Sequence, residues 1–429
     1  MNNINNKYDR AQAKLKFVVT DMKKNQLQEL FTKVKDGGKI LEDLSINNRG
    51  IYSVELNPNL LKDLFKNVPE NANFTLDQKI KWIPPIPKTQ RRMGAQLDVA
   101  KTTLGMEKVW AQGYTGKGKT ICVIDTGIYP HEDFGKRIID FKDIVNGKDG
   151  KPYDDNGHGT HCASDAAGDG KASGGKYVGP AYEANLVGVK VLDGGGSGSF
   201  SDVIKGIQYA VDKRKAFDKG DESGGIKIDT ISMSLGAWAS KPWNKDPVAL
   251  AVEEAVKSGI AVFIAAGNSG PGKGTIGTPA IAPNVFTTGA MDDKGTVDRA
   301  DDDIAYFSSR GPTLDKLVKP NAITPGVNIM AALSPGSELD RAGVPKTPDN
   351  KYASISGTSM ATPIMAGIGT IILQANPDLK PSEVGDILMK SAVKLSAHPD
   401  YDANTIGSGM ADPEKALKLA VFEGKHKAA

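Results

Sequence analysis

The chain has 429 residues, of which 39% are hydrophobic and 24% are charged, a composition typical of a soluble globular protein with two or three domains. The formal net charge of +3 gives no reason to expect nucleic acid or an anionic membrane as a partner, and only two cysteines exclude a disulfide framework. Glycine is unusually frequent, at 48 residues, but it follows no collagen-like period.

Apolar residues near the N-terminus alternate between strand-like and helical spacing. In chain order the predicted elements are a strand at 15–19, a helix at 27–34, strands at 40–44 and 50–56, a short helix at 60–64 and a strand at 74–82. This βαββαβ order is that of a small α+β, ferredoxin-like sandwich. A proline-rich linker at 83–95 follows, and its Arg91-Arg92 pair lies in a segment that a protease would cut easily.

The pattern changes from about residue 96. Near-continuous apolar runs at 120–124, 185–191, 230–233 and 260–265 are typical of buried parallel strands, and helical stretches such as 201–211 and 247–258 lie between them. We therefore predict a first domain over 1–95 and an α/β domain over 96–429, with a parallel sheet and helices on both of its faces.

Charge is divided unequally between these two regions. Residues 1–95 hold 17 Lys and Arg against 10 Asp and Glu, whereas residues 96–429 hold 37 against 41. One interpretation is a basic module that docks on an acidic one, because complementary charge steers association. The other is chance, with the charges on solvated faces.

No targeting or membrane-spanning segment is visible in the sequence. The first residues lack an apolar leader, and the longest apolar run, 364–373, is far shorter than the ~20 residues that cross a bilayer. We therefore expect a cytoplasmic protein with no membrane partner; a secreted protein whose leader had been trimmed would read in the same way.

Two motifs carry an acid and a histidine at places where α/β proteins gather their active groups. Asp125 ends an apolar strand, either as the cap of the next turn or as a buried carboxylate that orients a histidine. His158 stands between two glycines and one helical turn before Cys162. A helical zinc motif would need His at 162 and Glu at 159, so we disfavour a metal and interpret Cys162 as a small buried hydrophobe.

Two further motifs carry an amide and a serine. Asn268 follows a buried strand, either in a simple turn or as an amide donor aimed at an oxyanion. Ser359 opens an apolar helix, either as its N-cap or as a nucleophile at the positive end of the helix dipole. Each motif alone is weak evidence for a catalytic role, but the four together, in the order Asp, His, Asn, Ser along the chain, are strong evidence.

Taken together, these motifs resemble those of the subtilase (subtilisin-like serine peptidase) family, most of all the intracellular alkaline subtilases of bacilli. The resemblance covers about residues 105–420 and is strongest at Asp125-Thr126-Gly127, at His158-Gly159-Thr160-His161, at Ala265-Ala266-Gly267-Asn268 and at 357–363. It implies a subtilisin-like fold and a serine endopeptidase that cleaves proteins or peptides through an acyl-enzyme, with no cofactor for the chemistry. Catalysis would fall to Asp125, His158 and Ser359, and the oxyanion to Asn268.

The resemblance also implies where a substrate would bind. An extended peptide would pair with two backbone edges and fill pockets beside them. The implied substrate-binding residues are Gly196 and Ser197 on one edge, Ser234, Leu235 and Gly236 on the other, Leu235, Ala265, Gly267 and the floor residue Gly277 in the first pocket, and Phe200 in a second pocket. Since none of them is charged, we expect a preference for large apolar residues before the cut.

By element order alone, the first domain resembles the family's propeptide, which serves as an intramolecular chaperone and inhibitor. The chain would then be a precursor that processes itself between about Trp82 and Val99. The alternative is that the 84–87 segment crosses the active site as a block, as in intracellular subtilases with a short pro-segment.

Calcium is common in the family, so three stretches are candidates for a structural calcium ion. The loop at 169–176 has one acid and two lysines, which is poor for a cation that wants 6–8 oxygens. Asp133 and the acidic run 301–303 are the other candidates, and the alternative is that both lie in plain solvated loops.

The sequence also departs from the family's usual pattern at Asn321. Where the family usually has Lys-Pro-Asp, this chain has Lys319-Pro320-Asn321. This difference lies in a loop and puts local stability, not activity, in question.

Two competing functions fit the sequence less well. An esterase of the Gly-x-Ser-x-Gly type would carry its acid and histidine after the serine, whereas here both precede it. A binding protein with a dead site would lack at least one of the four roles, and all four are filled.

Overall fold

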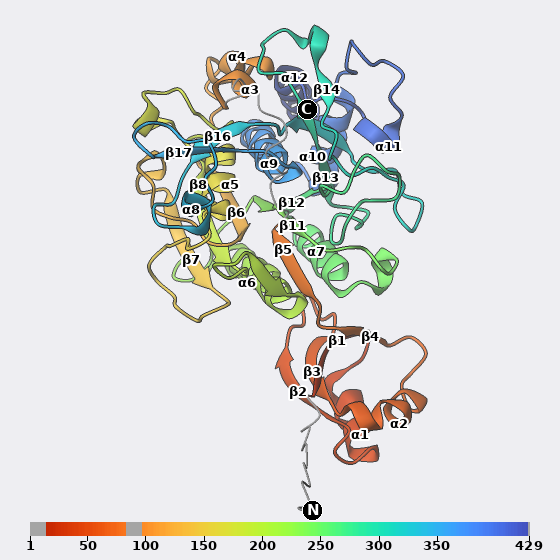
Figure 1. Cartoon of the computed structure of the whole chain (residues 1–429). Helices are drawn as coiled ribbons and strands as arrows, with labels where there is room; N and C mark the ends of the chain where they lie inside the picture. Colours follow the sequence, from red (N-terminus) through yellow and green to blue (C-terminus); the bar gives the residue numbers. More distant parts are fainter. Residues whose placement is uncertain (1–13, 83–96, 428–429) are drawn as a thin grey trace, which may run out of the picture. The chain divides into compact units, whose positions relative to one another are not determined.

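Figure 1 shows the computed structural model, which describes residues 14–82 and 97–427. The chain divides into two compact units, Met1–Gln78 and Lys79–Ala429. The sequence-based boundary at 95/96 stays a prediction, because 83–96 lies outside the described residues.

The first unit is built on one antiparallel sheet with the strand order β2-β3-β1-β4. Its elements are β1 (Leu15–Thr20), α1 (Lys24–Lys33), β2 (Gly38–Asp43), β3 (Ile51–Leu56), η1 (Pro58–Leu60), α2 (Leu61–Lys66) and β4 (Asn73–Leu76). Leu27 and Leu30 of α1 and Leu64 of α2 pack with Val19 and Val54 of the sheet in one buried cluster. This is the ferredoxin-like order that the sequence predicts.

The predicted strand at 74–82 is wrong as a single element. It ends with β4, and after the break at Asp77-Gln78 a new strand, β5 (Lys79–Trp82), belongs to the second unit. There β5 forms the middle of a three-stranded sheet, between β9 (Ser197–Ser199) and β11 (Leu235–Gly236). Apolar alternation alone does not reveal this break, because both halves have strand-like composition.

The second unit is built on a mostly parallel sheet in which only the edge strand β14 runs antiparallel. Its order is β14-β13-β12-β10-β6-β8-β7, with β15 beside β13. The strands are β6 (Thr120–Asp125), β7 (Ile138–Asp143), β8 (Asn185–Lys190), β10 (Thr230–Met233), β12 (Ala261–Ala265), β13 (Phe286–Asp292), β14 (Asp303–Ile304) and β15 (Ala322–Pro325). The predicted α/β class and parallel sheet are confirmed, with strand ends within one or two residues of the prediction.

Helices flank this sheet. They are α3 (Leu97–Thr103), α4 (Met106–Trp110), α5 (His158–Ala167), α6 (Phe200–Asp218), α7 (Pro247–Lys257), α8 (Glu338–Arg341), α9 (Thr358–Ala375), α10 (Pro381–Ser391), α11 (Ala403–Ile406) and α12 (Pro413–Lys427), beside the hairpin of β16 (Ile329–Ala332) and β17 (Tyr352–Ile355). Short 3-10 turns are η2 (Glu132–Phe134), η3 (Lys171–Ser173), η4 (Trp243–Lys245) and η5 (Arg299–Asp301). α6 is longer than the predicted 201–211, because its second half is polar and carries no apolar signal.

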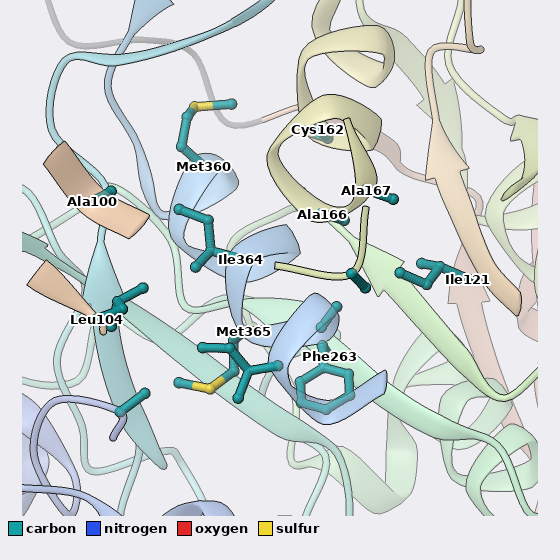
Figure 2. Packing of buried hydrophobic residues seen from close by; sticks show 14 of the residues in the cluster. Ala100, Leu104, Ile121, Cys162, Ala166, Ala167, Phe263, Met360, Ile364 and Met365 are labelled. Carbon is teal, nitrogen blue, oxygen red and sulfur yellow. The ribbon is translucent and has the colours of Figure 1, made fainter. Parts of the chain in front are cut away.

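The centre of the core is α9, in which every residue from 358 to 373 is buried. Figure 2 shows its side chains in one cluster with those of α5, β12 and neighbouring elements, among them Met360, Ile364, Met365, Cys162, Ala166 and Phe263. By length and composition α9 could cross a membrane, but 89% of it is buried inside the unit, as in the core helix of a folded domain. The packing of α5 on α9 brings the starts of these two helices together.

Candidate active site

Asp125 and His158 form a buried hydrogen-bonded pair at the carboxyl ends of the sheet strands. Asp125 is the last residue of β6 and His158 the first of α5, and each is only 1% exposed. Asp125 Oδ1 lies 2.7 Å from His158 Nδ1 and also accepts the Thr126 N–H at 2.7 Å. Because a carboxylate only accepts hydrogen bonds, the imidazole proton sits on Nδ1, which leaves Nε2 as the basic nitrogen.

The loop before α5 holds this pair in place through a second buried acid, Asp154. Its Oδ1 accepts from Thr126 Oγ1 and from the Gly157 N–H, and its Oδ2 accepts from both the N–H and the hydroxyl of Thr160. The motif that ends β6 and the motif that begins α5 are thereby tied to one carboxylate. Only glycine fits at 159, since a Cβ there would lie 2.1 Å from the Gly127 carbonyl oxygen.

Cys162 lies below the imidazole, one helical turn along α5. Its Sγ is 3.8 Å from both His158 ring nitrogens and donates to the Ser359 carbonyl at 3.4 Å. Asp125, His158 and Cys162 place three potential metal ligands within 4.8 Å of one another. However, burial and the nearby Asp125 and Asp165 raise the pKa of the thiol well above 9.0, so it stays protonated and is a poor metal ligand.

Ser359 stands in the first turn of α9, where free N–H groups and the helix dipole favour negative charge. It is 1% exposed, and its hydroxyl donates to the Ser234 carbonyl at 3.4 Å. Ser234 Oγ in turn donates to the Ser359 carbonyl at 2.8 Å. These two bonds tie the start of α9 to the segment between β10 and β11, which the sequence predicts as a substrate-binding edge.

Asn268 follows β12 and its amide is oriented by Thr358. The N–H and the hydroxyl of Thr358 both donate to Asn268 Oδ1, at 2.9 and 3.0 Å. The amide nitrogen therefore faces the nucleophile motif, where a Cβ at Gly357 would lie 3.1 Å from Nδ2. An N–H donor is thus aimed next to Ser359.

A pocket of 220 Å³ opens beside Asn268. It is lined by Lys81, Gly236, Ala237, Trp238, Ala265, Ala266, Gly267, Asn268, Ser269, Thr275, Gly277 and Thr278. Of the residues predicted for the first pocket, Ala265, Gly267 and Gly277 line it, whereas Leu235 is fully buried next to the lining residue Gly236. Apart from Lys81 of β5, the wall is uncharged.

The two predicted backbone edges are both engaged by β5. Lys79, Ile80 and Lys81 pair antiparallel with Ser199, Gly198 and Ser197 of β9. On the other side Lys81 and Trp82 pair with Gly236 and Leu235 of β11. Gly196 closes the turn before β9 with a positive φ of 76°, and Phe200 begins α6 behind it, 2% exposed.

Sequence reasoning missed Trp238, whose side chain is 65% exposed at the pocket. It follows the predicted edge at 234–236 by two residues, and strand alternation along that edge could have drawn attention to it. Asp154 was also missed, because an acid before the histidine motif has no spacing that distinguishes it from a solvated loop acid.

Two of the calcium candidates are engaged by protein groups. Both oxygens of Asp133 accept from the Tyr352 hydroxyl, and Oδ1 also accepts the Ala172 N–H. Asp169 Oδ1 accepts the Lys171 N–H, and Lys176 lies over the Tyr177 ring. The loop at 169–176 therefore does not fit a cation that needs several free oxygens.

Comparison with known proteins agrees with this geometry. The family described as "Subtilase family" matches residues 116–409. Serine protease AprX of Bacillus subtilis is 44% identical over 375 residues, 86% of this chain and 80% of that protein. The major intracellular serine protease of the same organism is 33% identical over 69% of this chain and 81% of its own length. Subtilisin DY of Bacillus licheniformis is 33% identical over 73% of this chain and 95% of its own length.

Proposed function

Since the chain belongs to the subtilase family and is a serine endopeptidase, we propose that Ser359, His158 and Asp125 cleave peptide bonds through an acyl-enzyme. The observation that carries this proposal is the 2.7 Å Asp125–His158 pair, held by α5 packed against the helix that Ser359 begins. A serine hydroxyl is a weak nucleophile until a positioned base takes its proton, and this pair supplies that base.

The proton moves in two steps. His158 Nε2 accepts the Ser359 proton as the oxygen attacks the scissile carbonyl, and the resulting imidazolium then gives that proton to the leaving amine. Asp125 holds the imidazole orientation and stabilises its positive charge. Asn268 Nδ2, with the Ser359 N–H, donates to the oxyanion of the tetrahedral intermediate. Water then repeats the sequence to release the acyl group.

For specificity, we propose that the 220 Å³ pocket takes a large apolar side chain before the cut. Apart from Lys81, which is itself positive, its wall is uncharged, so a Lys or Arg side chain would lose its hydration without gaining a counter-charge. Short substrates that differ only in this residue test the proposal. We expect kcat/KM for Phe or Leu to exceed that for Lys or Arg by at least about tenfold, and the reverse order would contradict it.

We further propose that the chain is a precursor that processes itself, with its N-terminal region as an intramolecular inhibitor. β5 supports this, because it adds to both predicted substrate edges by backbone pairing, as an extended substrate would. Ile80 in this strand is fully buried, and Lys81 reaches the pocket wall. The cut would then fall after Trp82, in a stretch outside the described residues.

The Ser359→Ala chain tests this precursor mechanism. We expect it to accumulate at full length in a protease-deficient host, whereas Ser223→Ala, on an exposed loop of the same unit, should be processed normally. Processing of the Ser359→Ala chain at the normal rate would contradict the proposal. If wild-type protein releases the N-terminal region but the released region does not inhibit, the blocking-segment alternative replaces the inhibitory domain.

A further inference from the structure

β8 ends in a buried lysine, Lys190, that the catalytic mechanism does not use. The residue is not exposed at all, and it lies opposite Asp125, the last residue of the neighbouring strand β6. Its ammonium group donates to the Thr126 carbonyl at 2.6 Å, to Asp155 Oδ1 at 2.7 Å and to the Leu192 carbonyl at 2.8 Å. A lysine has three N–H donors, so all of them are used.

The three acceptors belong to three different segments around the active site. Thr126 directly follows Asp125. Asp155 lies three residues before His158, in the loop that leads into α5. Leu192 begins the loop that leads to β9, one of the two strands that pair with β5. One side chain therefore joins the catalytic acid, the loop before the histidine and a predicted substrate edge.

Backbone and amide bonds connect the same three segments. The N–H groups of Val191 and Leu192 both donate to the Asp125 carbonyl, at 2.9 and 3.2 Å. Asn156 Nδ2 donates to the Gly194 carbonyl at 2.9 Å, which ties the loop before α5 to the loop before β9. The buried ammonium is thus one part of a network that extends from the catalytic acid to the substrate edge.

Stability alone does not explain a charged side chain at this position. Burying an ammonium is unfavourable, and buried ion pairs can often be replaced by apolar residues of similar volume without loss of stability. The carboxylate partner, Asp155, is 47% exposed, so water weakens this ion pair. A methionine would fill the space, whereas three N–H donors are needed only if separate acceptors must be held in fixed positions.

From this geometry we propose that Lys190 is a positioning residue, which holds the Asp125 end of β6 and the loop to β9 in one fixed arrangement. The inference rests on the proposed function, since it concerns how that same site is held. Without the ammonium, the carbonyls of Thr126 and Leu192 lose a shared donor, so the catalytic acid and the substrate edge both become less fixed. Two properties should then change together: the reactivity of Ser359 and the benefit of substrate residues that pair with the edge.

The reactivity of Ser359 is measured as the rate constant for labelling by a fluorophosphonate, a quantity to which only folded molecules contribute. In Lys190→Met, which keeps the side-chain length but has no donor, we expect this rate constant to fall by about tenfold or more, because a small displacement of catalytic groups can cost about 100-fold in rate. Lys142→Met is the matched control, since Lys142 lies in the neighbouring strand β7 and its ammonium donates to Asp149 alone among the described residues. The control should be labelled within about twofold of the parent rate.

The substrate edge is measured by comparing two substrates. A four-residue peptide can pair with the edge and a single-residue ester cannot, so the ratio of their kcat/KM values reports on the edge. We expect Lys190→Met to lower this ratio by about fivefold or more, mostly through a higher KM for the peptide, and Lys142→Met to leave it unchanged. A merely structural role would lower the yield or the Tm and would change neither the rate constant nor the ratio.

Asp155→Ala is the second variant, and it decides the test if Lys190→Met does not fold. It removes the exposed acceptor and leaves the two carbonyls, so both quantities should fall, by about threefold. Either quantity at the parent value in Lys190→Met, or in Asp155→Ala where only that variant folds, would overturn the proposal, and so would an equal fall in Lys142→Met. A parent that is not labelled at Ser359 would instead contradict the proposed function.

Discussion

Two loops of the catalytic unit bury a carboxylate in opposite ways. Beside the active site, Asp154 accepts five hydrogen bonds, from Thr126, Asn156, Gly157 and twice from Thr160. In the β13–β14 hairpin, Asp302 is also buried but accepts none from the described residues. The two side chains have the same chemistry and both are buried.

The two loops differ in whether the protein supplies hydrogen-bond donors to replace the water that the carboxylate loses on folding. Transfer of a carboxylate out of water costs several kcal/mol unless donors or a cation replace its hydration. Around Asp154 the chain supplies those donors itself, so the groups that position His158 need no ligand. Around Asp302 the chain supplies acids instead, so its negative charge is left without a partner among the described residues.

The largest expected effect is on the catalytic rate and comes from a substitution in the active site. Asn268→Ala should lower kcat by about 10²–10³, a figure that comes from another member of this family, because it removes a donor to the oxyanion. The free energy of unfolding should fall by only about 1 kcal/mol, because the half-buried Asn268 loses its two hydrogen bonds from Thr358. A fall of less than about fivefold in kcat, measured on a peptide substrate beside the Ser223→Ala control, would contradict the assigned role.

Asp154→Asn should destabilise the fold by about 3 kcal/mol, because the new amide faces the Thr160 N–H and hydroxyl with a donor instead of an acceptor. Urea unfolding in the Ser359→Ala background measures this. A change below about 1 kcal/mol would show that the Asp154 hydrogen bonds do not secure the loop.

The second unit also buries a lysine, Lys319, whose hydrogen-bond partners are neutral. Lys319 is 2% exposed and its Nζ donates to the Val285 carbonyl and to Asn321 Oδ1, both neutral. Burial lowers its pKa from 10.5 to about 7, against a small opposing effect of Glu253. Between pH 7 and 10.5 the unfolded chain therefore binds a proton that the folded chain has lost, and this group makes stability rise with pH over that range.

Asn321→Asp tests this pH effect, because a carboxylate beside Lys319 should raise its pKa. We expect the rise in unfolding free energy between pH 7 and 10 to shrink in the variant relative to the parent, both measured in the Ser359→Ala background. An unchanged pH profile would show that Lys319 does not titrate in this range.

The smallest effect has the opposite sign from Asp154→Asn. At pH 8, Asp302→Asn should stabilise the fold by about 1 kcal/mol, because it removes an unpaired buried charge. Burial and the neighbouring Asp301 raise the pKa of Asp302 to about 6, so this charge is present at pH 8 and the gain should vanish at pH 5. Destabilisation at pH 8 by urea unfolding would contradict the contrast between the two loops.

The motif residues could be predicted from the sequence because each lies where backbone geometry is local. Asp125 ends an apolar strand, and His158 and Ser359 begin helices, so flanking glycines and small residues mark them. The parallel sheet was predictable for the same reason, since its strands are short continuous apolar runs.

The features that were missed depend on contacts between distant segments. In the run 301–303, Asp301 is exposed, Asp302 is buried and Asp303 meets Tyr401, and composition alone treats the three as one solvated loop. Likewise the split at Asp77-Gln78 arises because β5 pairs with β9 and β11, more than 110 residues further along the chain. The alternation of apolar residues along a strand shows which face each side chain lies on, but it does not show which other strand pairs with it.

The central claim is that Ser359 is a nucleophile activated by the Asp125–His158 pair. Labelling with a serine-directed fluorophosphonate, mapped by peptide mass spectrometry, tests it most directly. We predict that the label lies on Ser359 alone and that His158→Ala nearly abolishes it, together with the hydrolysis of casein. Labelling of a different serine, or unchanged labelling of Ser359 in the His158→Ala protein, would contradict the account.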